Sequence, residues 1–208
     1  MCLAFQLIHE NKVMHKNVQT EHFLIEPETD LIKVIGFSKL REMKHDNSIG
    51  STRDADSSYT APECVDGQNY TRAADVWGIG LVLFQMASGG TAPYSIDFDA
   101  EKISQWVAAN GHKDTAVIGE KSEMFMNLMD GIFKIVPEER FSIGQIINEF
   151  LSEQVKAYIN GEKFKTAFMI TRKLMTIMNE EKNELHKVNM TDAAAEKEYE
   201  EYKLSVFK

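Results

Sequence analysis

Hydrophobic residues are densest between Ala74 and Met86, a run of thirteen positions in which only Asp75 and Gln85 are polar. Its apolar side chains would point to every side of a helix axis, as in a helix buried within a protein. A buried strand is the alternative, but this length favours a helix. The run is too short to span a bilayer, which takes about 20 residues. Ser88-Gly89-Gly90 predicts where the helix ends, and we expect it to form the centre of the fold.

The region before this run predicts one more helix and a small amount of β-structure. Residues 3–9 have the pattern of the end of an amphipathic helix. Residues 13–14 and 23–25 are typical of short strands, and Leu31–Ile35 predicts a strand that forms a hairpin with 23–25. The polar stretch 36–60 shows neither helical nor strand periodicity, so no element is predicted there.

The region after the central run predicts mainly helices. Residues 99–110 and 123–133 carry apolar side chains on one helical face. Ser142 is a suitable N-cap for a third helix that extends to Leu151. A short helical segment is also expected to begin at 61–63, before the central run. The pattern therefore predicts a mainly α protein with one small β-hairpin.

The last quarter of the chain has a different character, and we expect two domains, residues 1–155 and a helical C-terminal extension, residues 156–208. The extension has a narrow apolar stripe at helical spacing, with lysines and glutamates covering its other side. Such a stripe either packs on the rest of the chain or docks a partner protein. The candidate docking residues are Phe164, Phe168, Met175 and Met178.

Composition narrows the range of partners. The chain is 43% hydrophobic and 26% charged, as is usual for a globular protein. The formal net charge of −9 argues against binding to nucleic acid or to an anionic membrane. Two cysteines do not indicate a disulfide framework, so we expect a cytoplasmic protein, with association with the cytoskeleton as one option. No Cys/His spacing matches a zinc site, and we expect no metal or cofactor.

The order of several motifs resembles the C-terminal lobe of eukaryotic protein kinases. Arg140 lies where that family has a late structural arginine, which pairs with the glutamate of an A-P-E motif. The other matching segments, in chain order, are Ile8-His9 with His15–His22 (the catalytic loop H-R-D-L-x-x-x-N), Lys33–Ser38 (the strand ending in D-F-G), Ala61-Pro62-Glu63 (A-P-E) and Asp75–Gly80 (the buried helix). The resemblance covers roughly residues 1–151.

Residues that serve packing and loop anchoring in the family keep their types here. The resemblance implies a structural role for them rather than a chemical one. They are His15, Phe37, Glu63, Asp75, Trp77 and Arg140.

Four positions that would serve the chemistry depart from the family pattern. Asn17 replaces the aspartate base, and a positioned base contributes about 10²–10⁴ in rate. Gln19 replaces the lysine that faces the transferred phosphoryl group. His22 replaces an asparagine that binds Mg²⁺, which prefers oxygen ligands. Gly36 replaces the aspartate of D-F-G, a ligand of the bridging metal.

A glycine-rich phosphate loop and a strand lysine are also missing from the sequence, so we expect the N-terminal lobe to be absent. The resemblance then implies a pseudokinase lobe that is not an enzyme. We expect a structural or scaffolding subunit of a larger assembly. It would bind other proteins through its C-terminal helices and the exposed former inter-lobe face. Two alternatives stay open: a divergent serine/threonine kinase whose N-terminal lobe is supplied elsewhere, or an allosteric regulator of an active kinase.

Overall fold

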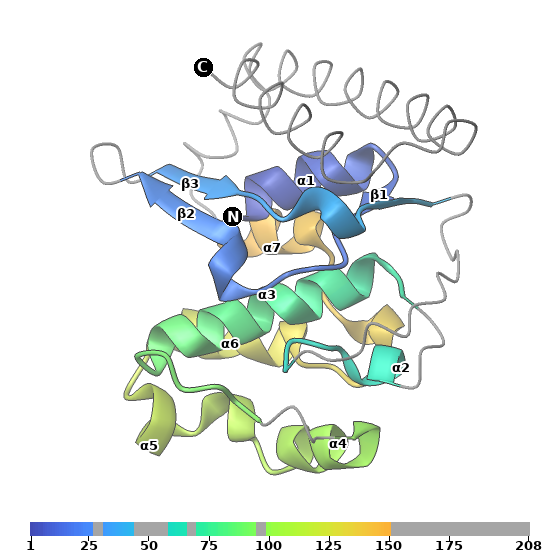
Figure 1. Cartoon of the computed structure of the whole chain (residues 1–208). Coiled ribbons are helices and arrows are strands. Elements are labelled where there is room, and N and C mark those ends of the chain that lie inside the picture. Colours follow the sequence, from blue (N-terminus) through green and yellow to red (C-terminus); the bar gives the residue numbers. More distant parts are fainter. Residues whose placement is uncertain (27–30, 44–57, 66–69, 95–98, 151–208) are drawn as a thin grey trace, which may run out of the picture. The chain divides into compact units, whose positions relative to one another are not determined.

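A computed structural model of the chain describes residues 1–26, 31–43, 58–65, 70–94 and 99–150 (Figure 1). Helices predominate in this part of the chain. The α-helices are α1 (Cys2–Glu10), α2 (Pro62–Val65), α3 (Arg72–Ala87), α4 (Ala100–Ala108), α5 (Thr115–Ile118), α6 (Glu123–Ile132) and α7 (Ile143–Phe150). The strands are β1 (Val13–Met14), β2 (Phe23–Glu26), β3 (Leu31–Val34) and β4 (Arg41–Glu42), and 3₁₀ turns cover Thr20–His22, Phe37–Lys39, Gly111–Lys113 and Pro137–Glu139.

Helix α3 is the central helix of this region, as the hydrophobic pattern predicts. In Figure 1 it lies between α1 with the strands on one side and α4 with α5 on the other. The side chain of Thr71 caps its first turn by accepting from the N–H of Ala73. The N–H of Gly90, a residue with φ of 104°, donates to the carbonyl of Gln85 at 2.7 Å and so closes the other end.

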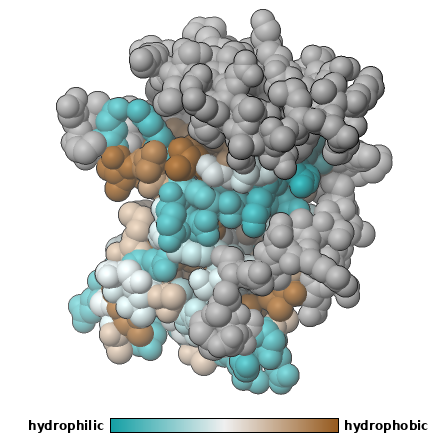
Figure 2. Space-filling model, viewed as in Figure 1, coloured by the Kyte–Doolittle hydropathy of each residue, from teal (hydrophilic) through white to brown (hydrophobic). Residues whose placement is uncertain are grey.

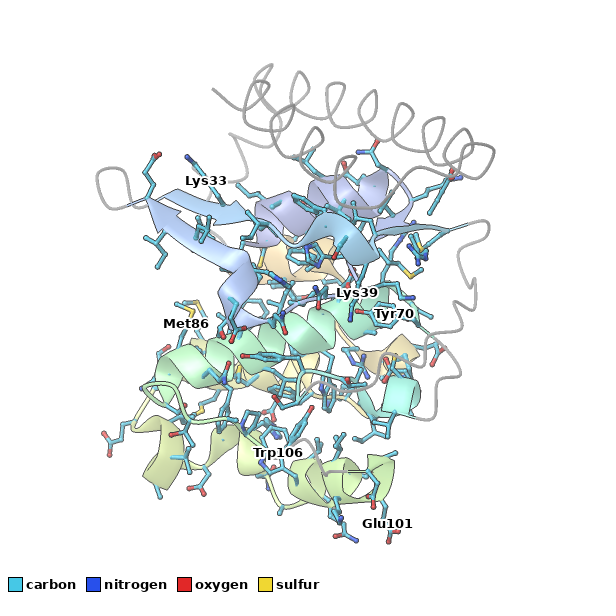
Figure 3. The ribbon with its side chains drawn as sticks, in the orientation of Figure 1. Lys33, Lys39, Tyr70, Met86, Glu101 and Trp106 are labelled. Carbon is cyan, nitrogen blue, oxygen red and sulfur yellow. The ribbon has the colours of Figure 1, made fainter. Side chains whose placement is uncertain are left out.

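The prediction of a helix apolar and buried on every side is wrong at its C-terminal end. Ala74 to Val82 are all buried, but Met86 is 58% exposed. Figure 3 labels Met86 at the end of α3 nearest the glycines that terminate it. Phe84 in the same turn is only 1% exposed and meets the ring of Trp106, so the last turn is buried on one side and exposed where Met86 lies.

Aromatic rings and one glycine bring α3 and the helices after it into close contact. The ring of Trp77 meets that of Phe133 edge-to-face, with centroids 4.9 Å apart. A Cβ atom added to Gly80 would lie 2.4 Å from the side chain of Ile132. Glycine is therefore required here, because any side chain would push α6 away from α3.

The two small sheets show both a confirmed prediction and an omission. Strands β2 and β3 pair antiparallel, with Ile25 opposite Ile32, which is the expected hairpin. Strand β1 pairs with β4, a strand that the sequence does not predict. Strand β4 consists of two charged residues within a polar stretch, whereas the equally short β1 is apolar; α5 has four residues and lacks the proline that marks the start of α2.

The remaining expectations concern segment bounds. Helices α2, α4, α6 and α7 lie where the sequence predicts them, within a few residues. The predicted boundary at 155 and the whole C-terminal extension lie outside the described residues. Among the helices that the structure describes, none is long and apolar enough to cross a membrane.

Candidate functional site

The candidate site is built on the carboxylate of Asp75, which is completely buried in the first turn of α3. One oxygen accepts from the backbone N–H of His15 at 2.8 Å, and the other from that of Lys16 at 2.9 Å. The ring Nε2 of His9 and the hydroxyl of Tyr70 each lie 2.9 Å from a carboxylate oxygen. Figure 3 labels Tyr70 near the start of α3. Four groups from three parts of the chain thus meet at one side chain.

The protonation of Asp75 follows from these contacts. Burial by itself raises the pKa of this carboxyl group, but the hydrogen bond and charge of His9, with further contributions from His15, outweigh it and lower the pKa. Asp75 is therefore ionised at neutral pH. A buried charge is costly unless it is well hydrogen-bonded, and here four groups hydrogen-bond to the carboxylate.

His15 begins the loop of residues 15–22, between β1 and β2, and connects this loop to the segment after β3. Its Nε2 donates to the carbonyl of Ile35 at 2.9 Å, and its Nδ1 accepts from the N–H of Asn17 at 3.3 Å. One nitrogen donates and the other accepts, so the ring is neutral, and burial accordingly lowers the pKa of His15. The rings of Phe5 and Phe37 each lie 5.4 Å from it, centroid to centroid.

The structure brings together the four positions that depart from the kinase pattern. The Nδ1 of His22 donates to the backbone carbonyl of Asn17 at 2.6 Å. The side-chain amide of Gln19 lies 3.3 Å from the Nε2 of the same ring. Gly36 lies directly against that ring, because a Cβ atom there would be 2.5 Å from it.

A second buried charge cluster lies at Arg140, whose side chain is fully buried. Its guanidinium binds both carboxylate oxygens of Glu63, at 2.8 and 3.0 Å. It also donates to the backbone carbonyls of Ala73 and Lys134, and its central carbon lies 4.9 Å from the ring centroid of Trp77. Bidentate pairing of this kind fixes orientation as well as distance.

Sequence reasoning missed another set of contacts around the loop. The hydroxyl of Tyr59 lies 2.8 Å from the Oγ1 of Thr20 and also donates to the side chain of Gln85. These two hydrogen bonds link Tyr59, which precedes α2, to the loop at Thr20 and to α3 at Gln85. Tyr59 follows a polar stretch without periodicity, so the sequence carries no signal for its contact.

The other candidate residues have different outcomes. In the described part of the chain, no three His, Cys, Asp or Glu side chains lie together as a metal-binding group would require. The docking residues Phe164, Phe168, Met175 and Met178 lie outside the described residues, so their role stays a prediction.

Comparison with known proteins gives the family. A family model described as the protein kinase domain matches residues 1–151. The chain belongs to the protein kinase family.

Its relatives include MAP kinase kinase MKK1/SSP32 of Saccharomyces cerevisiae, 30% identical over 76% of this chain and 32% of the relative. Putative serine/threonine-protein kinase A of Trypanosoma brucei brucei is 26% identical over 78% of this chain and 37% of the relative. The ovarian-specific serine/threonine-protein kinase Lok of Drosophila melanogaster is 28% identical, over 71% and 32%. The chain spans about a third of the length of these relatives.

These findings overturn the expectation that the chain is not an enzyme, because the family model and the serine/threonine kinase relatives point to a protein kinase. That expectation rested on residue types at four positions and on the lack of a glycine-rich loop and a strand lysine in the sequence. Losing a positioned base lowers a rate by about 10²–10⁴ and leaves the other contributions to catalysis in place. Substitutions at single positions are therefore no proof that a reaction is absent.

Proposed function

We propose that this chain is the helical, C-terminal lobe of a protein kinase family protein, and that it binds another protein within a larger cytoplasmic assembly. One observation carries the proposal. Four of the eight large hydrophobic side chains that are exposed in the described part of the chain lie within the β2–β3 hairpin and the residue that follows it. They are Leu24, Ile25, Ile32 and Ile35, which are 49%, 61%, 37% and 37% exposed, and we call the directly paired Ile25 and Ile32 the hairpin patch.

The geometry of the hairpin supports this role. Ile25 and Ile32 are directly opposite each other in the strand register, so their side chains form one apolar surface. Figure 2 shows hydrophobic surface at the position of the hairpin. On the other face of the hairpin, where Lys33 is opposite Leu24, Lys33 and Glu26 form an exposed ion pair at 2.8 Å. Exposed apolar side chains that lie together are typical of protein-binding surfaces, whereas single scattered ones are not. We identify this patch with the former inter-lobe face.

The test compares the unmodified chain with the double variant Ile25→Glu/Ile32→Glu and with the control Met124→Glu. Met124 is 58% exposed in the first turn of α6, where a carboxylate is well tolerated. Proteins that co-purify from native extract are identified, and each is then titrated as a pure component. We expect the hairpin variant to bind its partner at least tenfold more weakly, with an unchanged melting temperature. An unchanged Kd in that variant would show that the hairpin patch is not the binding surface.

We propose the C-terminal helices as a second docking element of the same assembly. The apolar spacing of Phe164, Phe168, Met175 and Met178 supports this. In the same titrations, Phe168→Glu/Met175→Glu should weaken binding, while residues 1–150 still melt cooperatively. If the Kd does not change, the extension has another role.

The second candidate function is ATP-dependent phosphoryl transfer to serine or threonine. The names of the relatives support it, as does the firm anchoring of the catalytic-loop-like segment on Asp75. This activity is compatible with protein binding. The purified chain is incubated with γ-labelled ATP, Mg²⁺ or Mn²⁺ and a general protein acceptor, beside Asn17→Ala and Met124→Glu. Transfer that Asn17→Ala lowers and Met124→Glu retains would support this candidate, whereas no transfer above background would count against it.

A further inference from the structure

Two of the positions that depart from the kinase pattern fit each other in space. Gly36 has φ of 82°, in the left-handed region. A Cβ atom built on it would lie 2.5 Å from both Cγ and Cδ2 of His22 and 2.6 Å from its Nδ1. Atoms in real proteins do not approach so closely, so the ring of His22 occupies the space that any side chain at residue 36 would need.

The ring cannot simply move aside. Its Nδ1 donates to the carbonyl of Asn17 at 2.6 Å, and its Nε2 lies 3.3 Å from the amide nitrogen of Gln19. The backbone carbonyl of His22 also accepts from the N–H of Ile35 at 2.9 Å, so the backbone on either side of the contact is paired. Rotating the ring away from residue 36 would break the side-chain bonds that close the loop from Asn17 to His22.

We propose that His22 and Gly36 form a matched pair that positions this loop. The ring of His22 closes the loop onto the Asn17 carbonyl, and Gly36 provides the space for the ring. His22 is thus a positioning residue, which acts through the backbone of Asn17. The inference goes beyond the proposed function, because it concerns the loop and not the hairpin patch.

A double-mutant cycle with a matched control tests the steric half of the proposal. Gly89 is the control because its φ is 70° and a Cβ atom there would meet no atom within 4 Å. Gly89→Ala introduces only left-handed strain, and we expect its melting temperature to fall by about 2–8 °C. Gly36→Ala adds a clash with the ring of His22, so its melting temperature should fall by about twice as much or more. When His22 is already replaced by alanine, Gly36→Ala should lower the melting temperature only as much as Gly89→Ala does.

Equal losses for Gly36→Ala and Gly89→Ala would overturn the proposal, as would a loss from Gly36→Ala that is the same with and without His22. Because Gly36→Ala could prevent folding, a second measurement uses the unmodified chain. Long-range ¹⁵N–¹H NMR at pH 8 should find the ring proton of His22 on Nδ1. A proton on Nε2 would contradict the hydrogen bond to Asn17.

Conservative replacement separates positioning from simple space filling. His22→Asn retains a donor that can reach the Asn17 carbonyl, whereas His22→Leu fills space without donating. Hydrogen exchange at the amide of Ile35, which pairs with His22, reports whether the loop is closed. We expect His22→Asn to keep most of the protection and His22→Leu to lose at least tenfold. Equal protection in both variants would show that the hydrogen bond does not position the loop.

Discussion

At the scale of single residues, the site depends on how one buried charge is satisfied. Asp75 has no contact with water, yet its two oxygens receive four hydrogen bonds. Two of the donors are backbone N–H groups of His15 and Lys16, which would otherwise lack an acceptor in a crowded interior. The carboxylate thus determines the path of the loop as much as it stabilises the first turn of α3.

Asp75→Ala is therefore expected to lower the free energy of unfolding by roughly 3–5 kcal/mol, because several buried donors lose their acceptor. Urea denaturation measures this. The control Asp114→Ala removes an exposed cap, which accepts from the N–H of Ala116, and should cost about 1 kcal/mol. If the two losses were equal, Asp75 would not anchor the loop.

The same carboxylate predicts a pH dependence. Folding lowers the pKa of Asp75 below its usual 3.8, so the stability that the ionised group contributes is present above that pH and is lost as pH falls through the folded-state pKa. Below pH 4 the unmodified chain should therefore lose stability more steeply than Asp75→Ala. If the free energy of unfolding fell equally steeply with pH in both proteins below pH 4, the lowered pKa of Asp75 would be contradicted.

At the scale of elements, one ion pair holds a helix too short to be stable alone. Helix α2 has four residues, and isolated helices of that length do not form in water. Glu63 in α2 is held by both terminal nitrogens of Arg140, which also binds the carbonyl of Ala73 in α3. The position of α2 thus depends on a contact between residues 77 apart in the chain.

Breaking this pair from one side should be more damaging than removing both partners. Arg140→Met leaves the carboxylate of Glu63 largely buried and unpaired, with an expected loss of roughly 3–5 kcal/mol in the free energy of unfolding. The double variant Arg140→Met/Glu63→Met should recover part of that loss. Urea denaturation of both single variants and the double variant gives the coupling energy, and strictly additive losses would mean that the pair does not act as a unit.

At the scale of the whole molecule, α3 is the helix around which the described core is built. It is buried from Ala74 to Val82 and again at Phe84, while Met86 in its last turn is exposed. The family match covers residues 1–151, which include all of this core.

Two substitutions in α3 test this contrast. Ile79 is fully buried, so Ile79→Ala should lower the free energy of unfolding by roughly 2–5 kcal/mol. Met86→Ala, seven residues further along the same helix, should change it by less than about 0.5 kcal/mol. Thermal unfolding of both variants decides, and comparable losses would mean that the last turn is part of the core.

The sequence by itself determined the family motifs, the order of the helices, the β2–β3 hairpin and the central place of α3. Each of these depends on local periodicity or on residue types at short spacing, which a single chain displays directly. It could not predict β4, α5 or the contact of Tyr59. Strand β4 is two charged residues in a polar stretch, α5 is short and has no proline at its start as α2 has, and a hydroxyl does not specify its partner.

Only the tertiary structure decided which distant groups meet. Asp75 lies in the first turn of α3, and its oxygens accept from the N–H groups of residues about 60 positions earlier in the chain. Met86 belongs to the apolar run but lies on the exposed side of the last turn of α3, whereas Phe84 in that turn is buried. In the sequence, His22 and Gly36 are two unrelated departures from a motif, and the folded chain makes them neighbours. The physical reason is that contacts between distant residues depend on the packing of the whole chain, which no local pattern contains.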